Sequence, residues 1–394
     1  MCHFARANRF KVTPFIILLG LIALSGLLLH HPSSLAYLPS DGAYYSSWGE
    51  AIAERWKGRG SEARPIWPGR GVLPLIIAFF EFSVKAHVVS VIAISAVTTT
   101  FTFLVIKIST AVAFGPQQLN WIPVGLFASS LPIVVYGGSV SREPYFWFGS
   151  ALVGLAVALW SQKRSGWAVI SFFSGGIVLL AVRPDLGLAL LYFVLGMGLV
   201  LEIISGVKAR SYFNPLAALV ISSLLLLAAP PSFDLLKPGW TAQAVEVSVA
   251  ELAGPGVGSA INRPVTPQRC EENLFFKLAC EAIFKLPATL LGPFPPGIWE
   301  SYKTAILFLG TIHFLAIGAL VIISLPRLKA RGPRQAAQIL AIGALGLLFV
   351  FAALLSNYGI IMRFRAIAEV LALPVALCTL EYLGAKRRLG QKEF

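Results

Sequence analysis

The chain contains ten apolar segments of about 20 residues, the length that a helix needs to cross the hydrocarbon core of a bilayer. They lie near residues 13–30, 87–106, 119–138, 145–161, 166–182, 186–204, 214–231, 304–325, 335–355 and 366–383. A helix satisfies its backbone polar groups internally, as the membrane interior demands. The sequence therefore predicts an all-α integral membrane protein with about ten transmembrane helices, within a range of about nine to eleven.

One further apolar run, residues 72–82, differs from these segments. It is about half as long as a span needs. Pro74 interrupts it near its start, and Glu81 lies near its end. We expect an interfacial or re-entrant helix here.

The composition agrees with a membrane protein. Of the 394 residues, 57% are hydrophobic and 13% are charged, against roughly 25% charged in a soluble domain. This excludes a soluble enzyme, a disordered chain and a fibrous repeat. The net charge of +14 could suggest nucleic acid, but in a membrane protein basic residues first indicate cytoplasmic loops, so no nucleic-acid partner is expected.

The basic residues also orient the chain. With the N-terminus inside, 16 of the 32 fall in inner loops or tails: Arg6, Arg9, Lys11, Lys107, Lys163, Arg164, Lys208, Arg210, Arg327, Lys329, Arg331, Arg334, Lys386, Arg387, Arg388 and Lys392. This is the positive-inside pattern. If residues 72–82 were counted as a span, every later loop would lie on the opposite side of the membrane, and the positive-inside pattern would be lost. We therefore expect both termini to be cytoplasmic.

This orientation divides the chain into three parts. An N-terminal transmembrane module covers residues 1–231 and contains a first outer loop, 31–86. A second outer loop of about 70 residues follows, 232–303, and a C-terminal transmembrane module covers 304–394. The second loop is too small for an independent catalytic domain; we expect a lid, or a spacer with one interfacial helix.

Unusual polar residues collect on the outer side of this topology. They comprise Asp41, Tyr44 and Tyr45 in the first outer loop, Arg142 and Glu143 after the third span, Arg183 and Asp185 after the fifth, and Asn357, Tyr358, Arg363 and Arg365 between the last two. Ionisable residues at membrane ends are costly unless they are paired or line a wet cavity. A mixed-charge pocket at the outer face would explain them.

The chemistry of these residues suits phosphate and hydroxyl groups. The planar fork of arginine binds phosphate with two parallel hydrogen bonds. A carboxylate beside it can accept a proton from a hydroxyl. Together they fit the transfer of a group from a lipid phosphate to an acceptor, with Asp41 as the base and Arg142, Arg183, Arg363 and Arg365 as phosphate ligands.

Each motif also has a purely structural interpretation. Asp41 could cap a helix that starts near Ala43. Arg142 with Glu143, and Arg183 with Asp185, could each form a local ion pair, and the last two arginines could bind lipid headgroups. Tyrosines and tryptophans at span ends could be an aromatic belt.

The sequence indicates no particular cofactor and no metal ligand. It contains no zinc spacing, P-loop, dinucleotide-binding or Ser-His-Asp signature, although a divalent metal is not excluded. Cys270 and Cys280 share the second outer loop, where one disulfide and two free thiols are both open.

The order of these parts resembles the polytopic GT-C glycosyltransferases, which include protein O-mannosyltransferases, aminoarabinose transferases of lipid A and sugar transferases of bacterial envelope polysaccharide. The resemblance rests on residues 41–45, on two helices expected at 44–57 and 72–82, on the motif 141–144, on Arg183-Pro184-Asp185, and on 357–359 with Arg363 and Arg365. It covers roughly residues 10–200 and 356–374.

The resemblance implies a GT-C-like fold and a function. The enzyme would use a polyprenyl-phosphate-linked sugar, invert the anomeric carbon in one step, and modify a glycan, lipid or protein acceptor at the outer, periplasmic face of a bacterial inner membrane. The family often pairs acids in the first loop, whereas Gly42 follows Asp41, and often has Asp in the second motif, where Arg142 and Glu143 stand here. These departures favour catalysis by Asp41 over a metal role for Glu143.

Two other functions fit the same residues. A polymerase or ligase of lipid-linked oligosaccharides would use the outer arginines without a base at Asp41. A flippase would need charged residues within its spans, and we expect the span interiors of this chain to be almost free of them.

Overall fold

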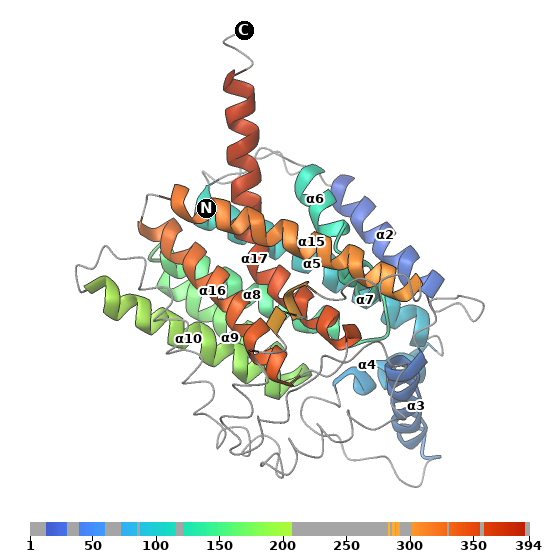
Figure 1. Ribbon diagram of the computed structural model, residues 1–394. Helices are drawn as coiled ribbons and strands as arrows, with labels where there is room; N and C mark the ends of the chain where they lie inside the picture. Colours follow the sequence, from blue (N-terminus) through green and yellow to red (C-terminus); the bar gives the residue numbers. More distant parts are fainter. Residues whose placement is uncertain are drawn as a thin grey trace. The chain divides into compact units, whose positions relative to one another are not determined.

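The computed structural model describes residues 13–29, 39–59, 72–84, 87–115, 121–206, 283, 286–287, 289–291, 302–328, 331–354 and 358–390. Every regular element in these ranges is a helix (Figure 1), which confirms the all-α prediction. The chain divides into two compact units, which we call unit 1 (Met1–Gly187 with Leu380–Phe394) and unit 2 (Leu188–Thr379).

Several helices have the length and apolar composition of membrane spans. Within the described residues there are five: Val88–Phe114, Glu143–Ser161, Ser165–Val182, Phe308–Arg327 and Arg365–Gly384. These five helices indicate an integral membrane protein. The count of ten spans stays a prediction, and the segment 214–231 lies outside the described residues.

Unit 1 is built around three long helices, α5 (His87–Phe114), α8 (Glu143–Ser161) and α9 (Ser165–Val182). Helix α8 packs against both α5 and α9. A Cβ atom on Gly175 of α9 would lie 2.8 Å from the carbonyl oxygen of Gly149 on α8. Glycine at these positions lets the two backbones approach closely, as at many helix contacts in membranes.

Helix α2 (Thr13–Leu29) packs on α5 in the same unit. Its 17 residues span about 26 Å, slightly less than a hydrocarbon core of about 30 Å. The Ser25 hydroxyl donates to the carbonyl of Val134 at 2.6 Å and so ties α2 to the segment that follows α5.

The prediction of one continuous span at 119–138 is wrong. This segment forms two short helices, α6 (Trp121–Ala128) and α7 (Leu131–Gly137), separated at Ser129 and Ser130. Pro132 causes the break, because its ring would clash with the carbonyl of Ala128 in a continuous helix and it has no N–H to donate. It lies instead in the first turn of α7, where the N–H is not needed.

The expectation that Lys107 belongs to an inner loop is also wrong. Helix α5 has 28 residues and continues to Phe114, past the predicted end at residue 106. Lys107 therefore lies within the helix, with its Nζ 6.0 Å from the ring centroid of Phe15 on α2.

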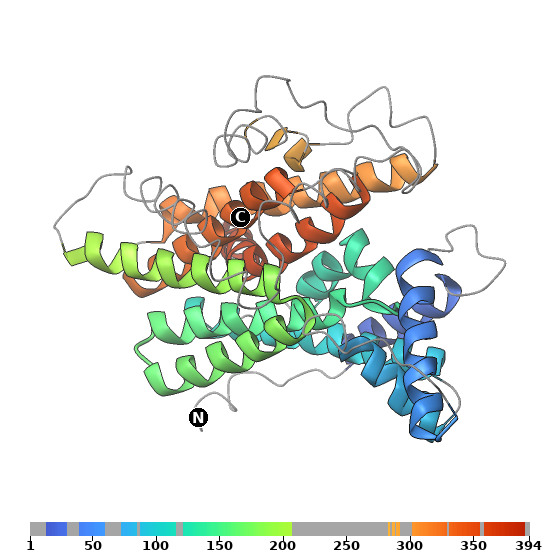
Figure 2. The ribbon, with the colours of Figure 1, turned by 90° about the horizontal axis from the view of Figure 1, so that it is seen from below.

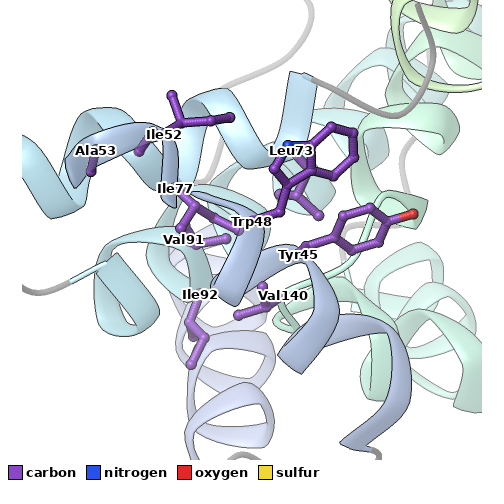
Figure 3. Close-up of a cluster of buried hydrophobic side chains, with 10 residues drawn as sticks. Tyr45, Trp48, Ile52, Ala53, Leu73, Ile77, Val91, Ile92 and Val140 are labelled. Atoms are coloured by element: carbon purple, nitrogen blue, oxygen red, sulfur yellow. The ribbon is translucent and has the colours of Figure 1, made fainter. Parts of the chain in front are cut away.

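Helices α3 (Pro39–Trp56) and α4 (Val72–Ser83) confirm the two helices expected in the first long loop. They pack against each other and share a core with the start of α5. This core contains Tyr45, Trp48, Ile52, Ala53, Leu73, Ile77, Ala78, Val91, Ile92 and Val140 (Figure 3). The apolar positions of α3 recur at helical spacing, which is why one side of this helix is buried.

The proposed N-cap at Asp41 does not fit the observed helix. Helix α3 begins at Pro39, so the backbone of Asp41 lies in the first turn. An N-cap residue has a non-helical backbone and precedes the first helical residue. An acidic residue in the first turn is still favourable, because it complements the partial positive charge of the helix N-terminus.

Unit 2 contains residues 188–206 of α10 (Pro184–Gly206), then α15 (Tyr302–Ser324), the short 3₁₀ helix η3 (Leu325–Arg327), α16 (Arg331–Leu354) and most of α17 (Tyr358–Gly390). Helices α15, α16 and α17 lie together (Figure 2). Thr379 of α17 donates to the carbonyl of Leu320 on α15 at 2.9 Å. Phe193 of α10 packs over Gly346 of α16, where any Cβ atom would collide with its ring.

The span interiors are not free of charge, which corrects the sequence-based expectation. Arg365 and Glu369 lie one turn apart in α17, and both are completely buried. Their apolar neighbours on either side dominate the hydropathy of the segment, so the two charges do not interrupt it.

Candidate functional site

Four of the residues singled out in the sequence come together in unit 1: Tyr45, Arg142, Glu143 and Arg183. We call them the Arg142 cluster. They come from α3, from the turn between α7 and α8, from the first residue of α8, and from the residue that ends α9. These segments are far apart in the sequence, and the packing of α8 against α5 and α9 brings three of them together.

The turn before α8 positions Arg142 and Glu143. The Ser139 and Ser141 hydroxyl oxygens lie 2.8 Å apart, and Ser139 Oγ lies 2.9 Å from the carbonyl oxygen of Tyr136. Pro144 is the second residue of α8, where proline fits the first helical turn without loss of a hydrogen bond. The compact turn holds both side chains at the N-terminus of α8.

Arg142 lies against the ring of Tyr45. Its guanidinium carbon is 5.2 Å from the ring centroid, within the range of a cation–π contact. Tyr45 is buried in the α3–α4 core, and its hydroxyl points away from Ile52 (Figure 3). The contact joins the turn before α8 to the helix whose first turn contains Asp41.

Glu143 pairs with Arg183. Arg183 Nη2 lies 3.5 Å from Glu143 Oε1, and the glutamate is only 7% exposed. The sequence suggested two local pairs, Arg142 with Glu143 and Arg183 with Asp185. The structure shows an ion pair between α8 and α9 instead, which joins one residue of each suggested pair. Arg183 has an extended backbone (φ −148°, ψ 86°) that ends α9, and its carbonyl accepts from Gly187 N at 2.7 Å.

Three buried polar groups on α5 and α8 were missed in the sequence. The Tyr145 and Ser95 hydroxyls face each other without standard hydrogen-bond geometry. The indole Nε1 of Trp147 is buried without a hydrogen-bond partner in the described part of the chain. Such groups are rare in proteins unless they meet a ligand or water. Tyr145 and Trp147 lie in the first two turns of α8, at a span end where the sequence pattern favours an aromatic belt.

The positions of several predicted residues are described only by their backbone. Asp41 and Tyr44 lie in α3, Asp185 lies in the first turn of α10, and Tyr358 begins α17. Asn357 lies outside the described residues, as do Cys270 and Cys280.

The two C-terminal arginines belong to unit 2. Arg363 is half-buried, and Arg365 is completely buried. The Arg365 Nε donates to the Thr289 carbonyl, and its Nη1 donates to the Thr311 hydroxyl, each at 2.6 Å. Its guanidinium carbon also lies 5.6 Å from the ring centroid of Phe314. The structure therefore surrounds Arg365 with protein groups on α15 and at Thr289.

A second ionisable pair accompanies Arg365, and the sequence did not suggest it. His313 Nδ1 of α15 lies 3.3 Å from Glu369 Oε1 of α17. The signal that could have found it is the presence of His313 and Glu369 deep within two apolar segments, because ionisable residues in membranes are usually paired.

No metal centre is formed by the described residues, which contain no group of three or more His, Cys, Asp or Glu side chains that could hold an ion. Among these residues, Cys378 is half-buried and is not part of a disulfide. The Arg142 cluster instead offers two guanidinium groups and one carboxylate, an arrangement suited to an anion that also presents hydrogen-bond donors.

Comparison of the chain with protein-family models, with curated proteins and with solved structures finds no match.

Proposed function

We propose that this protein is a membrane glycosyltransferase of the GT-C type. It transfers a sugar from a polyprenyl-phosphate donor to an envelope glycan, lipid or protein at the outer face of a bacterial inner membrane. The observation that carries the proposal is the contact between Arg142 and Tyr45. It joins a candidate phosphate ligand to the helix that contains the candidate base, Asp41.

The proposed reaction is a single displacement with inversion. The acceptor hydroxyl gives its proton to the Asp41 carboxylate while its oxygen bonds to the anomeric carbon. The bond between that carbon and the phosphate oxygen breaks, and polyprenyl phosphate leaves with the bonding electrons. Arg142 and Arg183 stabilise the charge that develops on the leaving phosphate, where fixed cations are most effective.

Glu143 has a positioning role in this proposal. Its ion pair with Arg183 holds that guanidinium at the end of α9. Arg365 is also a positioning residue, because its Nε and Nη1 donate to protein oxygen atoms. Arg363, Asn357 and Tyr358 remain candidates for donor binding, and Tyr44 and Asp185 for support of the site.

Substitution of Asp41 tests this function. In a deletion strain complemented with the variant gene, we expect Asp41→Asn to yield none of the envelope glycan or glycolipid that the wild-type gene restores. We expect Asp41→Glu to restore part of it. Glu54→Gln is the matched control, since Glu54 lies on the same helix in a surface pair with Lys57. A full amount of product with Asp41→Asn at normal expression would overturn the assignment of Asp41 as the general base. It would favour a polymerase or ligase.

A second candidate function is transport of a lipid-linked anion across the membrane. The observation that favours it is the buried group of Arg365, Glu369 and His313 in unit 2, because ionisable residues inside spans are typical of transporters. It predicts accumulation of lipid-linked precursor on the cytoplasmic side of a deletion strain, with transferase activity intact in isolated membranes. A transferase predicts loss of the activity itself.

A further inference from the structure

The turn that joins α15 to α16 in unit 2 is strongly basic. It contains Arg327, Lys329, Arg331 and Arg334, whereas residues 302–354 contain no Asp or Glu. Arg327 ends η3, which contacts both α15 and α16. Arg331 and Arg334 lie in the first turn of α16. Four basic residues therefore follow one another closely along a turn between two helices that contain no acidic residue.

Helix electrostatics do not account for these basic residues. The N-terminus of a helix has a partial positive charge, so a basic residue in its first turn is unfavourable. Arg331 and Arg334 both occupy the first turn of α16, and like charges repel at this spacing along a helix. Arg327 and Arg334 are also exposed. The positive charge of this turn is therefore suited to an anion from outside the two helices.

An exposed apolar stripe on α15 leads to the same turn. Its members recur every three or four residues, so they lie on one side of the helix: Leu309, Ile312, Leu315, Ala319 and Ile322. Ile322 at the end nearest the turn is 71% exposed. The stripe is about 20 Å long at the rise of an α-helix. One leaflet supplies about 15 Å of hydrocarbon, so a lipid tail can lie along the stripe for its full depth.

We propose that the α15–α16 turn and this stripe form a binding site for an anionic phospholipid. The lipid phosphate lies against the exposed guanidinium groups of Arg327 and Arg334, and an acyl chain lies along α15. The planar fork of arginine suits the phosphate oxygens, and clusters of basic residues next to a membrane helix attract anionic lipids. The charge pattern of the sequence predicts that this turn is cytoplasmic, where anionic lipids make the membrane surface negative.

A lipid accounts for both features of this surface. A soluble phosphate would neutralise the arginines and leave the apolar stripe uncovered, and a neutral lipid would cover the stripe and leave the arginines without an anion. The site is separate from the proposed transfer reaction, because its residues include no member of the Arg142 cluster and no candidate for donor binding.

Photocrosslinking with a labelled lipid tests the proposal. The full-length protein is placed in phosphatidylcholine bilayers that contain a trace of phosphatidylglycerol with a diazirine in its acyl chain, or a trace of phosphatidylcholine with the same label. Trypsin, which cuts after Lys303 and Arg327, releases most of α15 as the peptide 304–327. We expect phosphatidylglycerol to label this peptide about 30-fold more than phosphatidylcholine, about fivefold for each exposed arginine.

Charge variants show whether the arginines cause this preference. Arg327→Gln with Arg334→Gln should lower the labelling ratio of the two lipids by about 30-fold, and the same pair changed to lysine should retain most of it, because the charge remains. Arg334→Gln alone should lower the ratio about fivefold, and it decides the question if the double variant does not fold. Lys163→Gln with Arg164→Gln is the matched control, since both residues are exposed in the α8–α9 turn, and it should leave the ratio unchanged.

Three outcomes would overturn the proposal. Equal labelling of the α15 peptide by the two lipids in the wild type would show that the turn does not select an anionic headgroup. An equal loss in the Arg327/Arg334 and Lys163/Arg164 glutamine variants would show a general attraction of surface charge rather than a site. Loss of the preference on addition of inorganic phosphate, and not of the same concentration of chloride, would show that the turn binds a soluble anion instead.

Discussion

Arg142 illustrates how one side chain can serve packing and chemistry together. Its guanidinium lies against the Tyr45 ring at 5.2 Å, and its backbone provides the N-cap position of α8. A guanidinium bound to an aromatic face keeps its hydrogen-bond donors at the edge of the plane. It can thus be held in position by Tyr45 and still bind a phosphate.

Arg142→Ala should therefore reduce transfer activity by about 100-fold or more, the loss typical of one charge-stabilising donor. Arg142→Lys should recover only part, because an ammonium lacks the planar fork. Arg164→Ala is the control, since Arg164 is exposed in the turn between α8 and α9. Equal product from wild type and Arg142→Ala, measured as envelope glycan per unit of protein, would remove Arg142 from the site.

The Glu143–Arg183 pair gives a separate prediction for stability. Glu143→Gln and Arg183→Gln each leave the other residue as a poorly solvated charge without this ion pair. Each should therefore lower the free energy of unfolding, by at most about 3 kcal/mol. The double variant should recover part of the loss, with a coupling of about 1 kcal/mol. Denaturant unfolding in detergent measures all four proteins. Strictly additive losses would show that the 3.5 Å contact contributes nothing.

At the scale of elements, close helix contacts depend on residues without a side chain. Gly175 and Gly149 bring α9 and α8 together, and this contact sets the distance between Arg183 at the end of α9 and Glu143 at the start of α8. Crowding the two helices should therefore disturb the site as well as the fold.

Gly175→Ala should destabilise the protein by about 1–3 kcal/mol, the usual cost of overpacking. Gly166→Ala is a matched control on the same helix, because nothing lies within 4 Å of its added Cβ, and it should be neutral or stabilising by about 0.5 kcal/mol. The thermal unfolding midpoints of the two variants check this. The account of the α8–α9 contact fails if Gly175→Ala unfolds at the wild-type temperature.

The elements also show what the sequence could predict. The sequence predicts helices over 44–57 and 72–82 because their patterns are amphipathic or short and apolar, and the structure has helices at Pro39–Trp56 and Val72–Ser83. Arg142, Glu143 and Arg183 were expected to meet because the topology put them on one side. The pairing of Glu143 with Arg183 could not be predicted, because it depends on which helices are neighbours. The break before Pro132 and the pair of His313 with Glu369 were hidden by the high hydropathy around them.

At the scale of the whole molecule, the orientation in the membrane links the charges to function. The proposed site lies at the outer face of the membrane only if the loops with excess Lys and Arg are on the cytoplasmic side. Two exposed turns in unit 1 are suited to a test: the one that follows α3 at Gly58, and the one that joins α8 to α9 at Lys163.

Single cysteines at these turns, in a chain with its own four cysteines replaced, should react differently with a membrane-impermeant maleimide. We expect Gly58→Cys to be labelled in intact spheroplasts, and Lys163→Cys only after the membrane is opened. Labelling of Lys163→Cys in intact spheroplasts would reverse the topology and place the Arg142 cluster in the cytoplasm, where a donor used at the outer face could not reach it.

The most direct test of the central claim follows the donor lipid itself. Purified protein in bilayers, incubated with the membrane-lipid extract and envelope acceptors of its host, should convert a polyprenyl-phosphate-linked sugar into free polyprenyl phosphate. Mass spectrometry should show the two lipids changing in equal amounts with the wild type and with Glu54→Gln, and not with Asp41→Asn. Unchanged lipids with the wild type, in an extract that contains the donor and acceptor, would contradict the assignment as a glycosyltransferase.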